Sequence, residues 1–428
     1  MTLRVLVVAH NHPDFHPGGT EIFAHDLFRE YRQRADIETL FLAATNRLHR
    51  EQRPGTSFQA VGQATDEVIL WSGHFDRFYM SQIDSYGTVP HLVGLLEEFR
   101  PDVVHIHHML LIGVEFIALV RRVVPNARIV MTLHDYYAIC SHDGLMMRTK
   151  GRERCDRASP TRCSSCFPDI SADKFLLRER YLKTLLGQVD LFMAPSRFIK
   201  ERFVEWGLPA HAIDVVPNGR PAAEPAAHRP SPDGRRQVFG YFGNINPWKG
   251  VPSLLKAAQR LIATGHEDFE LRLHGGAPFQ AKEFVESIDA LIEETDPHVV
   301  RLGPYRREEI PHLIAAVDWV VVPSIWWENA PLVIQEAFLH RRPVITSNIG
   351  GMAEAVRDGI DGLHVRPDDP VALANTMRSA MDDPQLWNNL VAGIKPPATL
   401  TEIADRHLAA YRGIGRRGEV IQLKATAA

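Results

Sequence analysis

The sequence predicts an α/β protein built from two doubly wound domains with parallel sheets. The chain has 428 residues, which is too long for one ordinary hydrophobic core. Apolar strands alternate with helical patterns in both halves, as in parallel sheets covered by helices. Between the halves lies a proline-dense stretch without apolar periodicity, "PNGRPAAEPAAHRPSPDGRR".

The domain limits follow from that stretch. We expect an N-terminal Rossmann-like domain over residues 1–216, a linker over 217–236 and a second Rossmann-like domain over 237–395. Residues 396–428 are expected to form a helical segment that could cross back to the first domain. Ligands of open parallel sheets bind at the carboxyl ends of the strands, so two such domains facing each other predict a binding cleft.

The predicted strands are short apolar runs bounded by loops. They cover residues 3–9, 102–108, 127–133, 189–195 and 212–218 in the first half, and 237–243, 270–276, 299–303, 318–324 and 342–347 in the second. The first strand leads through the loop "HNHPDFHPGGT" into a helix.

Composition limits the function classes. The net charge of -4 argues against non-specific nucleic-acid binding through a basic surface. No apolar run approaches 18 residues, and the N-terminal apolar run lacks a cleavage site, so it is expected to be a strand rather than a signal peptide. We therefore expect a cytoplasmic protein, and peripheral contact with the inner face of a membrane is compatible with this composition. The sequence predicts no oligomeric state.

All four cysteines fall in one polar insertion, at about residues 136–170. They are Cys140, Cys155, Cys163 and Cys166, and the last two form a C-x2-C pair, a common half of a zinc site. A structural zinc ion would order a segment that has little apolar content, and free thiols are the alternative. The insertion lacks the H-x-E that precedes C-x2-C in zinc deaminases.

Two glutamates in "WWENAPLVIQEA" suggest a polar ligand. Glu328 lies in the loop after an apolar strand, and Glu336 lies about 7–8 Å along a helix expected to start near Pro331, with Asn329 as its cap. Most helix neighbours of Glu336 are apolar, so its carboxylate needs a hydroxyl or cationic partner. The pair could bind two hydroxyl-bearing parts of one ligand. The alternative is a helix-terminal glutamate and an internal salt bridge.

The loop "YFGNINPWKG" also joins a strand to a helix. Gly243 permits close approach of the backbone, and Lys249 could neutralise a diphosphate or could be a solvated lysine. The run "HIHH" contains His105, His107 and His108. Without a nearby acidic or cysteine partner in sequence, we expect these histidines to line the cleft at a strand end rather than to bind a metal.

Taken together, these residues resemble the retaining glycosyltransferases of family 4, which have the GT-B fold. The resemblance covers most of the chain. It rests on "GGTE", "TLHD", "APSRF", "VVPNG", "GNINPWKG", the E-x7-E pair and "IGGMAEAVRDGIDGLHVRPDD".

The resemblance implies a nucleotide-diphosphate sugar donor bound by the second domain, and a saccharide or lipid-linked acceptor. Glu328 would contact the donor sugar, Glu336 the ribose, Lys249 the diphosphate and His134 the transferring sugar. The family often has arginine where this chain has Asn244, so half of the usual cationic clamp is missing. The full set of implied donor-binding residues is Gly18, Gly19, Gly243, Asn244, Lys249, Asn329, Ala330, Pro331, Leu332 and Glu336.

The implied mechanism is same-face attack, in which the leaving phosphate oxygen takes the acceptor proton. His134, Lys249 and Glu328 are the expected catalytic set, with Glu328 in a positioning role, and no catalytic metal is expected. A nicotinamide-dependent oxidoreductase is a poor alternative, because the first strand is not followed by G-x-G-x-x-G. A sugar-nucleotide epimerase, a sugar phosphorylase and a non-catalytic sugar-nucleotide scaffold remain as alternatives.

Overall fold

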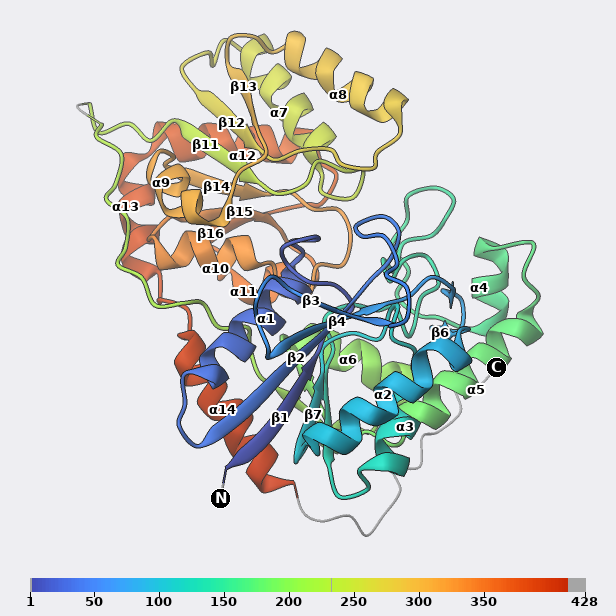
Figure 1. The fold of residues 1–428 in the computed structure, drawn as a ribbon. Helices are drawn as coiled ribbons and strands as arrows, with labels where there is room; N and C mark the ends of the chain where they lie inside the picture. The colour runs from blue at the N-terminus through green and yellow to red at the C-terminus, as the bar shows by residue number, and fades with distance from the viewer. Residues whose placement is uncertain (1, 232, 415–428) are drawn as a thin grey trace. The chain divides into compact units, whose positions relative to one another are not determined.

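The computed structural model describes residues 2–231 and 233–414, and its chain divides into two compact units. Unit 1 is Met1–Pro221 with Ala398–Ala428, and unit 2 is Ala222–Pro397. Each unit is a sheet of mainly parallel strands covered by helices, which confirms the predicted fold class (Figure 1). None of the helices in the described residues combines the length and apolar content that crossing a membrane requires.

Unit 1 is built on an eight-stranded sheet in the order β10-β9-β8-β7-β1-β2-β4-β3. Neighbouring strands are parallel except β3 and β4. A separate antiparallel pair is formed by β5 (Phe75–Asp76) and β6 (Ser81–Gln82). The sheet strands are β1 (Leu3–Val8), β2 (Ile37–Thr45), β3 (Phe58–Ala60), β4 (Glu67–Trp71), β7 (Val103–Ile106), β8 (Arg128–Thr132), β9 (Leu191–Ala194) and β10 (Ile213–Val215).

Helices of unit 1 come from both ends of the chain. They are α1 (Gly19–Arg32), α2 (Ser85–Phe99), α3 (Phe116–Val123), α4 (Pro160–Cys166), α5 (Ala172–Leu186), α6 (Arg197–Trp206), the short 3₁₀ turn η1 (Ala210–Ala212) and α14 (Leu400–Gly413). The last helix, α14, packs in the same core as α1, and Tyr411 from α14 is fully buried there. Its hydroxyl lies 2.9 Å from the hydroxyl of Tyr31 and 2.6 Å from Nδ1 of His105. The predicted C-terminal segment is therefore helical over α14 and part of unit 1, while its residues 415–428 lie outside the described residues.

Unit 2 contains six parallel strands in the order β13-β12-β11-β14-β15-β16. The strands are β11 (Val238–Phe242), β12 (Glu270–His274), β13 (Val299–Gly303), β14 (Trp319–Val322), β15 (Val344–Ser347) and β16 (Gly362–Val365). The helices are α7 (Val251–Ala263), α8 (Lys282–Glu293), η2 (Arg307–Glu309), α9 (Ile310–Ala315), α10 (Leu332–Leu339), α11 (Gly350–Ala355), α12 (Pro370–Asp382) and α13 (Pro384–Gly393).

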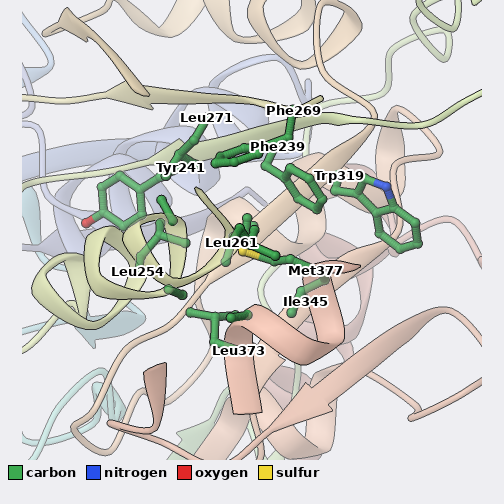
Figure 2. Packing of buried hydrophobic residues seen from close by; sticks show 14 of the residues in the cluster. Phe239, Tyr241, Leu254, Leu261, Phe269, Leu271, Trp319, Ile345, Leu373 and Met377 are labelled. Carbon is green, nitrogen blue, oxygen red and sulfur yellow. The ribbon is translucent and has the colours of Figure 1, made fainter. Parts of the chain in front are cut away.

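Alternating strand residues divide the core of unit 2 between the two faces of its sheet. On one face, Phe239 and Trp319 pack with Leu254 of α7 and Met377 of α12 (Figure 2). On the other face, strand residues pack against α9, α10 and α11, as the burial of Phe338 illustrates. Both faces are covered, which is why the strands are continuous apolar runs in the sequence.

From Ala222 on, the proline-dense stretch belongs to unit 2 and packs within it. Its described residues contain no helix or strand beyond the isolated bridge at Arg220. The buried Asp318 carboxylate accepts from Arg229 at 2.8 Å and from Arg236 at 3.3 Å. Fully buried Arg342 donates to the carbonyl of Ala227 at 2.6 Å. These bonds satisfy backbone and charged groups that would otherwise be buried without partners.

Candidate functional site

The strand order of unit 2 defines where its ligand should bind. Strands β12 and β13 lie on one side of β11, whereas β14, β15 and β16 lie on the other. The order in which the chain adds strands therefore switches from one side to the other between β11 and β14. Open α/β sheets bind ligands at such a switch point, outside the carboxyl ends of the strands. The two loops that leave this point, residues 243–250 and 323–331, carry most of the expected donor-binding residues.

The two loops are in direct contact. The amide of Ile325 donates to the carbonyl of Trp248 at 2.8 Å. At Gly250, where φ is +72°, a Cβ atom would lie 1.8 Å from the carbonyl oxygen of Pro323. Only glycine fits this approach, so Gly250 fixes the start of α7 against the loop after β14.

Glu328 and Lys249 form an ion pair inside this contact. Oε1 of Glu328 accepts from Nζ of Lys249 at 2.6 Å, and the carboxylate residue is only 6% exposed. The same oxygen accepts from Oγ of Ser324 and from Nε1 of Trp326, each at 2.9 Å. Nζ of Lys249 also lies 5.6 Å from the Trp326 ring centroid. Glu328 in the loop therefore forms an internal salt bridge, and Lys249 is not a solvated lysine.

Glu336 is the fifth residue of α10 and is half-buried. The helix begins at Leu332 with Pro331 as its N-cap, and no described side chain caps it. The expected Asn329 cap was therefore wrong, as was the placement of Pro331 inside the first turn. Pro331 has an extended ψ of 120°, which ends the loop one residue later than expected.

Asn329 is instead part of a close loop contact with α11. The amide of Gly351 donates to the carbonyl of Glu328 at 2.7 Å. A Cβ atom at Gly351 would lie 1.5 Å from the carbonyl oxygen of Asn329. Gly351 thus contacts the backbone carbonyls of Glu328 and Asn329. Ala330 then leads to Pro331 and into α10, which begins at Leu332.

Sequence reasoning missed three side chains beside the carboxylates. Burial raises the pKa of Tyr241, and the charge of Glu328 raises it further. Burial likewise raises the pKa of Tyr305, with Glu336 as the second cause. Both phenols therefore stay protonated. His274 ends β12, stacks on Phe242 with ring centroids 4.6 Å apart, and its Nε2 has no hydrogen-bond partner among the described residues. The available signal was a polar residue at a strand end, as in "LRLHGG".

Glycines at the carboxyl ends of β11 and β12 let these two backbones meet. Gly243 has a φ of +143° and Gly275 a φ of +145°. A Cβ atom at Gly275 would lie 1.8 Å from the carbonyl oxygen of Gly243. Asn244 follows with an exposed side chain, and its carbonyl accepts from the Tyr241 hydroxyl at 2.8 Å. An amide group therefore occupies the exposed position where the family often has arginine.

Unit 1 has its own switch point between β1 and β7, surrounded by ionisable side chains. His10 Nε2 lies 3.0 Å from Oε1 of Glu21, and His108 Nε2 lies 2.8 Å from Oδ2 of Asp135. Burial alone would lower the pKa of His10, but Glu21 outweighs it and raises that pKa. Burial opposes ionisation of Asp135, yet the charge and hydrogen bond of His108 bring its pKa down to about 2.

His134 follows β8 and is neutral at physiological pH. Burial lowers its pKa to about 4, although the charge of Asp135 opposes this change. Its Nε2 lies 2.9 Å from Nδ1 of His107. His105 and His107 are fully buried, and His108 is 4% exposed. The expectation that they line a cleft was wrong for His105 and His107, which are covered by α1, α14 and the loop around His134. His108 instead packs against His10, with ring centroids 4.3 Å apart.

Gly18 and Gly19 lie at the start of α1. Gly18 is its N-cap, and no described side chain caps the helix. The first-turn amides of such a helix favour an anion. A Cβ atom at Gly18 would lie only 2.5 Å from Oε2 of Glu21. The absence of a side chain at Gly18 therefore lets this turn lie close to the His10–Glu21 pair.

The four cysteines of unit 1 surround one cavity. Cys140, Cys155, Cys163 and Cys166 all line it, and its volume of about 20 Å³ has room for about one water or ion. Burial raises the pKa of Cys140 to about 11 and that of Cys163 to about 12, so neither is a reactive thiolate at neutral pH. No three sulfur atoms lie within 4.8 Å of one another in the described part of the chain, so binding an ion requires them to move inward.

Known proteins share both the sequence pattern and the fold. Over 337 residues, the chain is 29% identical to a glycogen synthase of Mycobacterium tuberculosis, covering 75% of this chain and 72% of that protein. Over 205 residues it is 30% identical to the lipopolysaccharide 1,2-N-acetylglucosaminetransferase of Salmonella typhimurium, covering 45% of this chain and 53% of the relative.

Among solved structures, the Anabaena protein HepE in complex with UDP and glucose superposes with a TM-score of 0.67 at 19% identity, over 96% of this chain and 100% of HepE. The likeness confirms the GT-B fold. The model of the family described as "Glycosyltransferase Family 4" matches residues 17–224, and that described as "Glycosyl transferases group 1" matches residues 236–383. The two matches together span most of the chain, which belongs to the family 4, group 1 glycosyltransferases.

Proposed function

We propose that this glycosyltransferase moves a sugar from a nucleotide-diphosphate sugar to a hydroxyl of a saccharide or lipid-linked acceptor, with retention of the anomeric configuration. One observation carries the proposal. A cation and a carboxylate, Lys249 and Glu328, are paired at the switch point of unit 2, where ligands of open parallel sheets bind. The complexes of HepE with UDP and with UDP and glucose support a donor of this class.

In the proposed complex the diphosphate competes with Glu328 for the ammonium group of Lys249. Glu328 then keeps its hydrogen bonds from Ser324 and Trp326. The acceptor position that Lys249 leaves would accept hydroxyls of the donor sugar. Asn329, Ala330, Pro331 and Leu332 would lie against the phosphate at the start of α10. Ala330 and Leu332 can offer backbone amides there, and the N-cap Pro331 makes no side-chain cap bond. Glu336, about 7 Å further along the axis, would hold the ribose hydroxyls.

The proposed chemistry needs no carboxylate nucleophile. The bond from the anomeric carbon to the phosphate oxygen breaks, and the acceptor oxygen bonds to the same face of that carbon. The acceptor proton passes to the departing phosphate oxygen. Lys249 and helix-terminal amides stabilise the charge that develops on the phosphate, whereas Glu328 positions the sugar. We propose no catalytic metal ion in this step.

We assign supporting roles to residues of unit 1. The neutral imidazole of His134 can donate or accept one hydrogen bond to the transferring sugar, and the amide of Gly19, beside the N-cap Gly18, suits a phosphate oxygen. The name of the Salmonella relative, an enzyme of lipopolysaccharide, supports a lipid-linked saccharide as acceptor. With such an acceptor, the enzyme would work in the cytoplasm and contact the inner face of the membrane peripherally.

We also propose that Cys140, Cys155, Cys163 and Cys166 hold one structural zinc ion. All four line the same small cavity. Cys163 and Cys166 are three residues apart on α4, so both thiols project to one side of that helix. Residues 133–171 contain no other helix or strand beyond the bridge between Met147 and Arg154 in the described structure, so a metal would add order to a segment with little regular structure.

The first prediction concerns the reaction. A thermal-shift screen with nucleoside diphosphates and nucleotide sugars should identify the donor, because a ligand at 100 times its Kd stabilises by about 2.7 kcal/mol. With that donor, NMR of the product should show the same anomeric configuration as in the donor. An inverted product would contradict same-face transfer, and release of the sugar as a sugar phosphate or as an epimerised nucleotide sugar would favour the alternative enzymes.

The second prediction is that Glu336→Ala weakens binding of the nucleoside diphosphate. A lost hydrogen bond to a charged group costs about 1.5–3 kcal/mol, which corresponds to about 10- to 100-fold in Kd. Calorimetry should show this loss, while Glu283→Ala, at an exposed glutamate of α8, should leave Kd unchanged. Equal affinities of wild type and Glu336→Ala would rule out the ribose contact.

The third prediction is that Lys249→Ala loses about 100- to 1,000-fold in turnover, the usual effect of removing a stabiliser of developing charge. Lys256→Ala, at an exposed lysine of α7, the helix that follows the loop of Lys249, is the matched control. Asn244→Arg should be tolerated, because Asn244 is exposed, and should tighten diphosphate binding by adding a guanidinium. Thermal melting checks folding of each variant. Near wild-type turnover of a folded Lys249→Ala would show that other groups balance the phosphate charge.

The fourth prediction is that protein purified without added metal carries one zinc ion that depends on the cysteines. Elemental analysis should show one equivalent less in Cys163→Ser/Cys166→Ser than in the wild type and in Ser165→Ala, an exposed neighbour on α4. Equal zinc content in all three proteins, together with four readily titratable thiols in the native wild type, would refute this site.

A further inference from the structure

A second group of potential metal ligands lies in unit 1, away from the cysteines and outside the proposed chemistry. His12 is in the loop after β1, His25 is on α1, and Glu67 is the first residue of β4. One ligand atom from each lies within 4.8 Å of the other two, and this is the one such group of histidine, cysteine, aspartate or glutamate residues in the described part of the chain. Three elements far apart in sequence therefore bring these side chains together.

The three side chains converge on a single oxygen. Oε2 of Glu67 lies 2.8 Å from Nε2 of His12 and 3.0 Å from Nε2 of His25. In a tetrahedral site with bonds of about 2.0–2.2 Å, neighbouring ligand atoms are about 3.3–3.5 Å apart. The two oxygen–nitrogen distances would need to lengthen by only a few tenths of an ångström to admit an ion, and the two nitrogens already lie within 4.8 Å of each other. Two imidazoles and one carboxylate are a donor set that zinc accepts, with a fourth position left open.

The surroundings are suited to holding the imidazoles in place. His12 is 1% exposed, and the side chains of His25 and Glu67 are 16% and 11% exposed. Phe41 lies against both histidines, with ring centroids 5.8 Å from His12 and 5.2 Å from His25. The walls are thus apolar, and the remaining exposure of His25 and Glu67 leaves a way in for an ion.

A second carboxylate is placed to support the metal-bound form of His12. At present the amide of Asp14 donates to Nδ1 of His12 at 3.2 Å, so the ring proton is on Nε2, facing Glu67. A metal ion on Nε2 would move this proton to Nδ1. Oδ2 of Asp14 lies 3.7 Å from Nδ1 and can accept it after a small side-chain rotation. A carboxylate behind a metal-binding imidazole is the usual outer partner in zinc sites.

From this geometry we propose that His12, His25 and Glu67 bind a zinc ion that ties the loop after β1 to β4. The loop is organised around His12, whose carbonyl accepts from the amides of Phe15 and His16, both at 3.0 Å. His16 in turn accepts from the amide of Gly18, the N-cap of α1, at 2.9 Å. An ion that fixes His12 therefore fixes the segment that ends at the start of α1.

The direct test is metal titration of the full-length protein with Co²⁺ as a spectroscopic substitute for Zn²⁺. Co²⁺ bound by nitrogen and oxygen ligands gives visible ligand-field bands without the sulfur-to-cobalt charge-transfer band that cysteine ligands add, so this site is distinguished from the cysteine cavity. We expect one such equivalent in the wild type. Glu67→Gln should weaken it about 100-fold or more, since even an outer partner is worth about 10- to 100-fold in affinity.

Glu67→Gln keeps an oxygen that both imidazoles can donate to, so it should fold, and its melting temperature without metal is the check. His211→Gln, at an exposed histidine of unit 1, is the matched control and should bind Co²⁺ as the wild type does. Asp14→Asn should lose about 10-fold in affinity. In the wild type but not in Glu67→Gln, Zn²⁺ should raise the melting temperature and slow amide exchange over residues 13–18. Equal Co²⁺ binding by wild type and folded Glu67→Gln, or no sulfur-free equivalent at all, would show that the three side chains form only a hydrogen-bonded network.

Discussion

The ion pair between Lys249 and Glu328 is the interaction on which the rest of the donor site depends. A carboxylate that is 6% exposed needs donors to offset the loss of water, and Glu328 has three on one oxygen. One donor comes from the loop after β11 and two from the loop after β14. The pair therefore couples the two loops that form the switch point of unit 2, and glycines at 250 and 351 permit the backbone approaches around it.

The pair also suggests how the site can distinguish a charged ligand from other molecules. In the chain alone, the ammonium group is neutralised by Glu328, so an uncharged sugar gains little by entering. In the proposed complex a diphosphate takes over the ammonium group, and the carboxylate accepts sugar hydroxyls while it keeps its bonds from Ser324 and Trp326. With Asn244 in place of an arginine, Lys249 is the cation that this loop supplies.

At the switch point of unit 1, the side chain expected to contact the sugar is neutral rather than part of an ion pair. Two histidine–carboxylate pairs at this switch point, His10 with Glu21 and His108 with Asp135, lie beside His134, which burial keeps neutral. Behind His134 the contacts continue through His107 and His105 to Tyr411 on α14. The C-terminal helix thus supports the side chain that we expect to contact the sugar.

Much of the fold was predictable because the spacing of apolar residues over a short window distinguishes a strand from a helix. The runs ending at His134 and Ser324 were both recognised as strands, and Glu336 does lie on a helix five residues from its start. Strands β2 to β4 were missed, although "IETLFLAAT" is largely apolar. Partners far apart in sequence were also missed: 79 residues separate Lys249 from Glu328, and α14 covers His105 from 306 residues away. Local patterns place a side chain at a strand end, but only the tertiary fold decides whether it faces solvent, as Asn244 does, pairs with a buried carboxylate, as Lys249 does, or lies in the core, as His105 does.

The most direct test of the account is a crystal structure of the full chain with the nucleoside diphosphate selected by the donor screen. The account predicts the diphosphate at the carboxyl ends of β11 and β14, with Nζ of Lys249 bonded to a phosphate oxygen and withdrawn from Oε1 of Glu328, now 2.6 Å away. It also predicts the ribose hydroxyls against Glu336. A nucleotide bound elsewhere, or one bound here while Lys249 stays on Glu328 and other groups hold the phosphates, would contradict it.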